Sequence, residues 1–182
     1  RTGKGIETAV EKELDSIPEW DWSSARDAKF WAYLPALRQY LERRRFAVID
    51  KDHVELLGAK SIPLGQWVSG LRSRHTKTNN VPDWQVVELE SIPGWDWNGR
   101  HARFQRNLEA LRQFCDEHGT RKIPLGEEVT FYEFEIKLWV WINNMRARNR
   151  KGDLPSWEAA EIEVILGPGW DRPRGHGTRR GA

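Results

Sequence analysis

A seven-residue motif, written almost identically at three positions, constrains this chain more than any other feature. It reads SIPEWDW at 16–22 and SIPGWDW at 91–97, and it decays to GPGWDRP at 167–173. The leading tryptophans, Trp20, Trp95 and Trp170, follow one another at intervals of 75 residues. Equal spacing of a rare residue indicates a repeated structural unit. The chain is therefore expected to be a tandem array.

Each repeat is small, so its core must be rich in large side chains. A unit of about 75 residues lies near the size at which a single hydrophobic core is only marginally sufficient. The 182 residues of the chain include 11 tryptophans, and one buried aromatic side chain removes roughly 150–250 Å² from water. We therefore expect most tryptophans to be core residues.

Charge and cysteine content exclude several classes of protein. The formal net charge is +2, so no global basic field indicates a nucleic-acid partner. A single cysteine excludes a disulfide framework, and no stretch resembles a signal peptide or a long apolar span. These features predict a soluble cytoplasmic protein with no membrane partner. The first residue, Arg1, is not a methionine, which indicates a fragment or a processed chain.

Apolar residues recur at helical spacing in three segments of each repeat. In the first repeat, helices are expected from about residue 23 to 45, from Leu64 and from Pro82. In the second, they are expected from about Gly99 to a left-handed cap at Gly119, from Leu138 and from Pro155. Residues 1–22 match the segment that precedes the later motifs, so they are expected to be the last helix of a truncated preceding repeat.

A long stretch separates the first and second helices of each unit. It covers 46–63 in the first repeat and 120–136 in the second, and it is rich in β-branched and aromatic residues. An irregular connection or a short hairpin is expected there. The predicted fold is therefore all-α: tandem three-helix bundles with a long irregular or short β-like connection between helices one and two of each unit.

The domain organisation follows from these boundaries. The sequence predicts a helix of a preceding repeat at 1–22, one repeat at 23–97 and a second at 98–172. The remaining segment, 173–182, is rich in glycine and arginine, a composition that predicts a disordered basic tail.

The near-zero net charge conceals a repeated alternation of sign. No Asp or Glu lies between residues 57 and 82 or between 137 and 152, whereas the third helices are acidic. Basic residues that flank the buried stripe of the second helix are expected to straddle a nucleic-acid backbone. The predicted binding residues are Arg72, Arg74, Lys77, Arg146, Arg148, Arg150 and Lys151.

Other interpretations of these residues remain open. The arginines can instead pair with the acidic third helix or point into solvent. The tryptophans can stack on bases if exposed, or form the core if buried. The second tryptophan of each motif, Trp22 and Trp97, is expected to pack against the first helix of the next repeat.

The sequence contains no convincing catalytic constellation. Cys115 and His118 lie three residues apart, but no second Cys/His pair accompanies them, and Cys115 falls on the apolar stripe of its helix. There is no glycine-rich phosphate loop, and the carboxylates lie on charged helix faces. We therefore expect no enzyme activity, no cofactor, no metal and no small-molecule substrate.

The order of the motifs resembles the helicase-associated domain, whose repeats of about 70 residues occur in tandem in bacterial, especially actinobacterial, helicase-like proteins. The similar segments are LGQWVSGLRSR at 64–74 with LESIPGWDW at 89–97, and the stretch from Leu138 to Trp170. The first repeat departs from the pattern at Arg45, and the second departs at Trp139, where the pattern has glycine in both cases.

The resemblance implies a three-helix bundle in each repeat and an accessory role in nucleic-acid binding. We therefore expect a DNA partner, a nucleoid-associated location and a helicase motor in the same full-length chain. Duplex is favoured slightly over single strand, because the best basic residues lie on a helix and most tryptophans are expected to be buried. The alternative is a protein-interaction or spacer array that does not contact DNA.

Overall fold

The computed structural model describes residues 25–172. The predictions for 1–22, which include Trp22, and for the basic tail at 173–182 lie outside the described residues. The internal contacts divide the chain at Pro35, and the described residues from Ala36 to Arg172 belong to one compact unit. The repeat boundaries placed at 23, 98 and 172 remain predictions.

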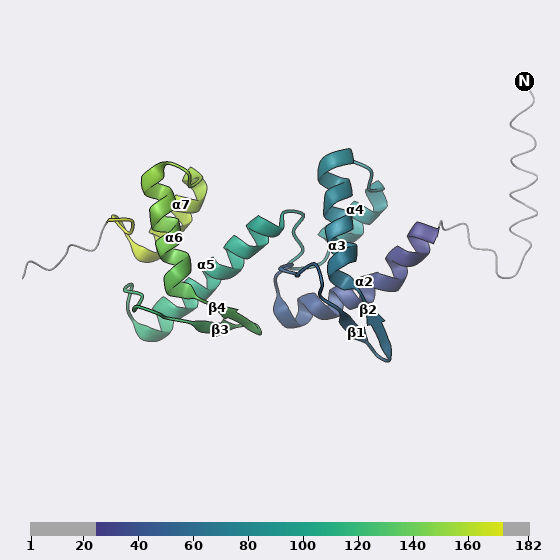
Figure 1. Ribbon diagram of the computed structural model, residues 1–182, viewed down its shortest axis with the longest axis horizontal. Coiled ribbons are helices and arrows are strands. Elements are labelled where there is room, and N and C mark those ends of the chain that lie inside the picture. Colours follow the sequence, from purple (N-terminus) through teal and green to yellow (C-terminus); the bar gives the residue numbers. More distant parts are fainter. Residues whose placement is uncertain (1–24, 173–182) are drawn as a thin grey trace, which may run out of the picture. The chain divides into compact units, whose positions relative to one another are not determined.

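Each repeat is built from a long helix, a two-stranded hairpin and two further helices (Figure 1). The first repeat contains α2 (Ala25–Arg44), β1 (Glu55–Leu57), β2 (Lys60–Ile62), α3 (Leu64–Ser73) and α4 (Asp83–Glu90). The second contains α5 (Gly99–His118), β3 (Val129–Phe131), β4 (Phe134–Ile136), α6 (Leu138–Lys151) and α7 (Ser156–Leu166). The predicted fold class is confirmed, including the short β-like connection between the first and second helices.

The two hairpins are antiparallel and occupy the same place in each repeat. In the first, Glu55 pairs with Ile62, and in the second Val129 pairs with Ile136. The second hairpin turns through Tyr132 and Glu133, both of which have positive φ angles, of 45° and 62°. Two left-handed residues are what a tight two-residue hairpin turn requires, although glycine and asparagine usually supply them.

The core of each repeat lies under the apolar stripe of its second helix. In α3 the buried side chains include Leu64, Trp67, Val68 and Leu71. In α6 they are Leu138, Ile142 and Met145. The expectation that most tryptophans are core residues is wrong for the described residues. Trp67 and Trp170 are buried, but the others are half-buried or exposed: half-buried are Trp95, Trp97, Trp139 and Trp141, and exposed are Trp31, Trp84 and Trp157. Among the described residues, no helix is long and apolar enough to cross a membrane.

Local sequence determines where the first helices begin and end. The Asn98 side chain caps α5 by accepting hydrogen bonds from the backbone N–H groups of Arg100 and His101. Gly119 ends this helix with φ of 60°, as the sequence predicts. At the equivalent position after α2, Arg45 takes φ of 59° without being glycine. The first repeat therefore tolerates backbone strain that the second avoids.

Replacing Gly119 with alanine is expected to lower the free energy of unfolding by about 1 kcal/mol, because a Cβ disfavours the left-handed conformation. An added Cβ would meet no atom within 4 Å, so backbone strain is the only new cost. Urea denaturation measures the change. Gly119→Asn is the control, since asparagine tolerates this conformation better. Equal stability of the alanine variant and the wild type would contradict the expectation.

Candidate nucleic-acid interface

Arg72 extends from the last turn of α3 to the repeated motif of the same repeat. Its Nε and Nη2 atoms donate hydrogen bonds to the backbone oxygen of Asp96, at 3.1 and 2.6 Å, and Nη2 also donates to the oxygen of Ala47, at 2.7 Å. Its guanidinium lies 5.4 Å from the centre of the Trp95 ring. Burial lowers the pKa of Arg72, and the Asp96 charge opposes that shift.

Arg146 has the same role in the second repeat. From α6, its Nε donates to the backbone oxygen of Trp170 at 2.7 Å, and its Nη1 donates to the side-chain oxygen of Asn143 at 3.1 Å. Arg72 and Arg146 therefore both hold the tryptophan motif against the second helix of their own repeat. Both acceptors in the motif are backbone carbonyls, which no residue type in the sequence identifies.

The remaining predicted residues of the first repeat follow α3. The helix continues as one π-helical turn at Arg74–Thr78, where Arg74 is half-buried and Lys77 is exposed. His75 in this turn stacks on Trp97, with ring centroids 4.0 Å apart and planes 9° from parallel. The structure therefore places the basic end of α3 beside the motif tryptophan.

In the second repeat, the three basic residues at the end of α6 differ in their contacts. Arg148 is half-buried, forms an ion pair with Glu158 at 3.4 Å and donates to the Asp153 oxygen at 3.1 Å. Arg150 is exposed and donates to the backbone oxygen of Asp171 at 3.0 Å. Lys151 is exposed at the last position of the helix. Arg148 is thus the residue of this group that pairs with the acidic third helix.

Trp97 makes its ring contacts within the first repeat. Besides the stack on His75, its ring lies 5.2 Å from that of Trp95, edge to face, and its Nε1 donates to a carboxylate oxygen of Glu90 at 3.0 Å. These contacts attach Trp97 to the end of α3 and to α4. Its packing against the first helix of the next repeat remains a prediction.

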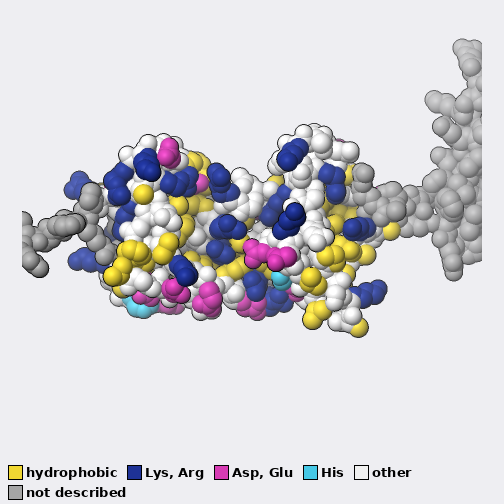
Figure 2. Space-filling view, in the orientation of Figure 1, with side chains coloured by type: hydrophobic (Ala, Val, Ile, Leu, Met, Phe, Trp, Pro, Cys, Tyr) yellow, Lys and Arg dark blue, Asp and Glu magenta, His cyan; other side chains and the backbone are white. Residues whose placement is uncertain are grey.

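Acidic and basic side chains are unevenly distributed over the surface. On the face shown in Figure 2, Lys and Arg side chains are spread over α3 and α6, whereas most of the visible Asp and Glu side chains lie toward the hairpins. Among residues 25–172, neither Lys77, Arg150 nor Lys151 has a carboxylate partner. Hydrogen bonds to neutral carbonyls leave the positive charge of an arginine uncompensated.

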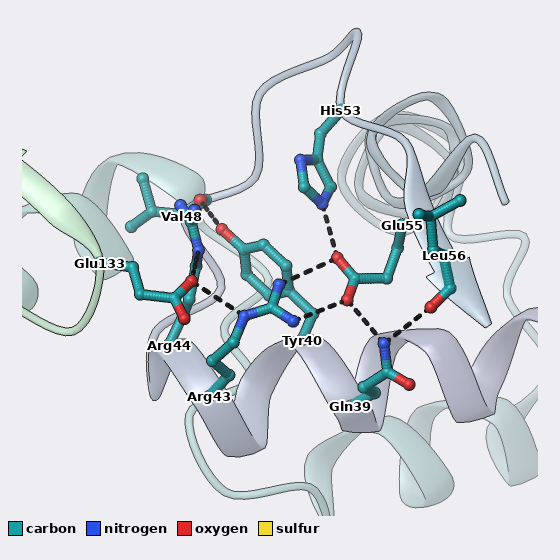
Figure 3. A network of polar contacts seen from close by, with 9 residues as sticks. All are labelled: Gln39, Tyr40, Arg43, Arg44, Val48, His53, Glu55, Leu56 and Glu133. Carbon is teal, nitrogen blue, oxygen red and sulfur yellow. Dashed lines mark hydrogen bonds and ion pairs between the residues drawn. The ribbon is translucent and has the colours of Figure 1, made fainter. Parts of the chain in front are cut away.

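A second charged cluster, which is not among the predicted binding residues, lies at the end of α2 (Figure 3). Arg43 and Arg44 both bind Glu133 from the turn of the second hairpin, and Arg43 also binds the buried Glu55. The sequence signal is the run of three arginines at 43–45. Nothing in the sequence pairs that run with a glutamate about 90 residues away.

Within residues 25–172, no group of three or more His, Cys, Asp or Glu side chains is arranged to hold a metal ion. Cys115 is half-buried on α5, and burial, together with the charge of Asp116, raises the pKa of its thiol. A raised pKa disfavours the reactive thiolate.

Comparison with known proteins gives one match. A family model described as "Helicase associated domain" matches the chain twice, over residues 27–98 and 101–171. The two matched segments correspond to the two repeats seen in the structure. Neither the curated proteins nor the solved structures contain a match to the chain.

Proposed function

The chain belongs to the helicase-associated domain family, of which it carries two consecutive copies, and from this premise we propose that it binds DNA through the basic ends of its second helices. The family assignment makes it an accessory module of helicase-containing systems. We propose further that a helicase motor lies in the same full-length protein, and that the array contributes affinity for DNA rather than catalysis.

The observation that carries this proposal is the uncompensated charge at the ends of α3 and α6. Lys77, Arg150 and Lys151 are exposed and have no carboxylate partner among the described residues. Each phosphate that such residues neutralise releases counterions, so affinity arises without any contact to bases. The interface is therefore one of backbone contacts, which position the protein but specify little sequence.

The contacts divide the predicted residues into those engaged within their own repeat and those exposed to solvent. Arg72 and Arg146 are engaged by the motif carbonyls, and Arg148 is engaged by Glu158. We assign direct phosphate contact to the exposed group, Lys77, Arg150 and Lys151, with Arg74 adding to the local field. The charge of Arg148 is compensated by Glu158. Duplex DNA is favoured over single strands, because the exposed basic residues lie at helix ends.

Replacing Lys77, Arg150 and Lys151 together with alanine is expected to weaken binding of a fluorescently labelled duplex. Because each lost phosphate contact lowers the slope of log K against log salt by about 0.9, the triple variant should show a slope smaller by roughly 2–3. Fluorescence anisotropy across a salt series measures both affinity and slope.

The matched control is the triple variant Lys51→Ala, Lys60→Ala, Lys122→Ala, which removes the same charge from exposed positions outside the second helices. It should change affinity much less. Equal losses in the two triple variants would reduce the effect to net charge and contradict the assignment of the site. No binding of duplex or single strand by the wild type at low salt would contradict the proposal itself.

A second candidate function is a spacer or protein-interaction array without DNA contact. It is favoured by one observation, namely that Arg72, Arg146 and Arg148 are engaged by groups of their own repeats. Under this function, the salt series would show no binding, although the fold would be intact. The same titration therefore separates the two candidates.

A further inference from the structure

At the end of α2, two arginine side chains donate hydrogen bonds to one carboxylate oxygen. Nε of Arg43 lies 2.9 Å and Nε of Arg44 lies 3.2 Å from the same oxygen, Oε2 of Glu133 (Figure 3). Two N–H groups that converge on one oxygen form a site for an oxyanion, and guanidinium groups suit phosphate as well as carboxylate. We call this pair the Arg43–Arg44 site.

Arg43 is held by a second carboxylate besides that of Glu133. Its two terminal nitrogens donate to the two carboxylate oxygens of Glu55, at 3.1 and 3.2 Å. Glu55 is only 3% exposed, and it is also held by Gln39 at 2.9 Å and by His53 at 2.8 Å. Burial raises the pKa of Glu55, but the hydrogen bonds from Arg43, His53 and Gln39 outweigh that effect and lower the pKa overall. Glu55 therefore stays ionised and holds Arg43 in place.

Arg44 is positioned by aromatic rings rather than by a second carboxylate. Its guanidinium lies 5.5 Å from the centre of the Tyr40 ring and 4.8 Å from that of Phe134. Arg106 of α5 lies against the same Phe134 ring, at 4.6 Å. Because both guanidiniums of the site are held by other groups, their Nε–H edges would remain directed at a common point without Glu133.

The turn that carries Glu133 is strained. Tyr132 and Glu133 both have positive φ angles, and neither is a residue type that adopts this conformation readily. The first hairpin has glycine at its turn, Gly58, where φ is 59°. In the second repeat, the two residues with strained backbone are also the two that contact the end of α2. The Arg45 guanidinium lies 5.2 Å from the centre of the Tyr132 ring, and Glu133 binds the Arg43–Arg44 site. This pattern indicates that the identity of the Glu133 side chain matters.

The contact between Glu133 and the site is weak enough to be exchanged. The side chain of Glu133 is 48% exposed, and those of Arg43 and Arg44 are 38% and 25% exposed. Ion pairs this open to solvent contribute little net stability. A phosphodiester also carries one negative charge and offers two free oxygens, so it can satisfy both Nε–H groups that Glu133 now satisfies.

We propose that Arg43 and Arg44 form a phosphate-binding site that Glu133 occupies in the free protein, and that a phosphodiester of bound nucleic acid replaces this carboxylate. The proposal rests on the proposed function for the source of the phosphate. The site itself lies outside the second helices and is a further contact, one that the hairpin of the second repeat restrains.

Glu133→Gln removes the competing charge while keeping the shape and hydrogen-bonding capacity of the side chain. We expect it to tighten binding of a 20-base-pair duplex about two- to fivefold, the factor that corresponds to one exposed ion pair, and to steepen the salt slope by about 0.9. The control is Glu135→Gln on the adjacent strand, because Glu135 is exposed and its carboxylate accepts from Thr130 at 2.9 Å. It removes the same charge from the same hairpin and should have a smaller effect.

The gain must depend on the arginines. In the Glu133→Gln background, replacing Arg43 and Arg44 with alanine should abolish the increase in affinity and in salt slope. Equal effects of Glu133→Gln and Glu135→Gln would overturn the proposal, as would a gain that persists without the two arginines. Thermal melting of each variant verifies that only folded protein is compared.

A titration without DNA distinguishes this proposal from the proposed function. Inorganic pyrophosphate is titrated into the wild type and Glu133→Gln, and the side-chain Nε–H signals of Arg43 and Arg44 are followed by NMR. Saturable shifts at lower pyrophosphate concentration in Glu133→Gln than in the wild type support the site even if no duplex is bound. Absence of shifts in both proteins overturns the site even if the duplex binds elsewhere.

Discussion

Replacing Gly65 with alanine is expected to lower the free energy of unfolding by about 3 kcal/mol or more, the largest effect of any small substitution considered for this chain. An added Cβ would lie 1.9 Å from the backbone oxygen of Asp50 and 2.7 Å from that of Lys51. Neither atom belongs to a flexible side chain, so the loop before β1 or the start of α3 must move. The Gly65 N–H also donates to the His53 oxygen at 3.0 Å, which fixes the loop in place.

Gly70 provides a matched control on the same helix. A Cβ there would meet only the end of the Arg74 side chain, at 3.8 Å. Gly70→Ala should therefore raise stability by about 0.4–1 kcal/mol, because alanine loses less conformational entropy than glycine on folding. Urea denaturation of the two variants side by side measures the difference. Similar changes in the free energy of unfolding for the two variants would show that the loop does not restrict a side chain at position 65.

Replacing Arg72 with alanine is the second substitution with a large expected effect. It leaves the backbone oxygens of Ala47 and Asp96 without their donor in a partly buried position, at a cost of about 2–4 kcal/mol. Arg72→Lys should recover only part of this loss, because an ammonium group cannot reproduce the planar set of donors. Lys77→Ala, an exposed position in the following turn, should change stability by less than about 0.5 kcal/mol.

This comparison separates a structural arginine from a DNA contact. If Arg72 serves mainly to hold the motif, affinity for duplex per folded molecule should change little in Arg72→Lys while the melting temperature falls. A variant with unchanged melting but much weaker DNA binding would assign Arg72 to the interface instead. Denaturation and anisotropy are therefore both needed on the same preparations.

The sequence predicts the elements of this fold well because their signals are local. The helical stripe at Leu64, Trp67, Val68 and Leu71 reappears as the buried face of α3, and the left-handed cap at Gly119 is where the sequence places it. The predicted boundaries at Pro82, Pro155 and Gly119 follow from proline and glycine. These residues act through their own backbone conformations and need no knowledge of distant partners.

The contacts of the candidate sites were harder to predict, because they depend on distant and unspecific partners. Arg72 and Arg146 bind backbone carbonyls, and every residue has one, so no residue type identifies the acceptor. The turn at Tyr132–Glu133 contains no glycine or asparagine, so its position was not apparent from turn chemistry. Glu133 is brought to Arg43 by the fold across about 90 residues.

The two carbonyl-binding arginines bear on how the number of copies in such a chain can change. Each arginine binds the motif at the end of its own repeat. Arg72 donates to the backbone oxygen of Asp96, and Arg146 donates to that of Trp170. A gene duplication or deletion that begins and ends just after the motif would transmit this arginine together with its acceptor. A breakpoint between the second helix and the motif would instead join the arginine of one copy to the motif of another. Copy number can therefore change by whole units, with each added copy complete in this respect.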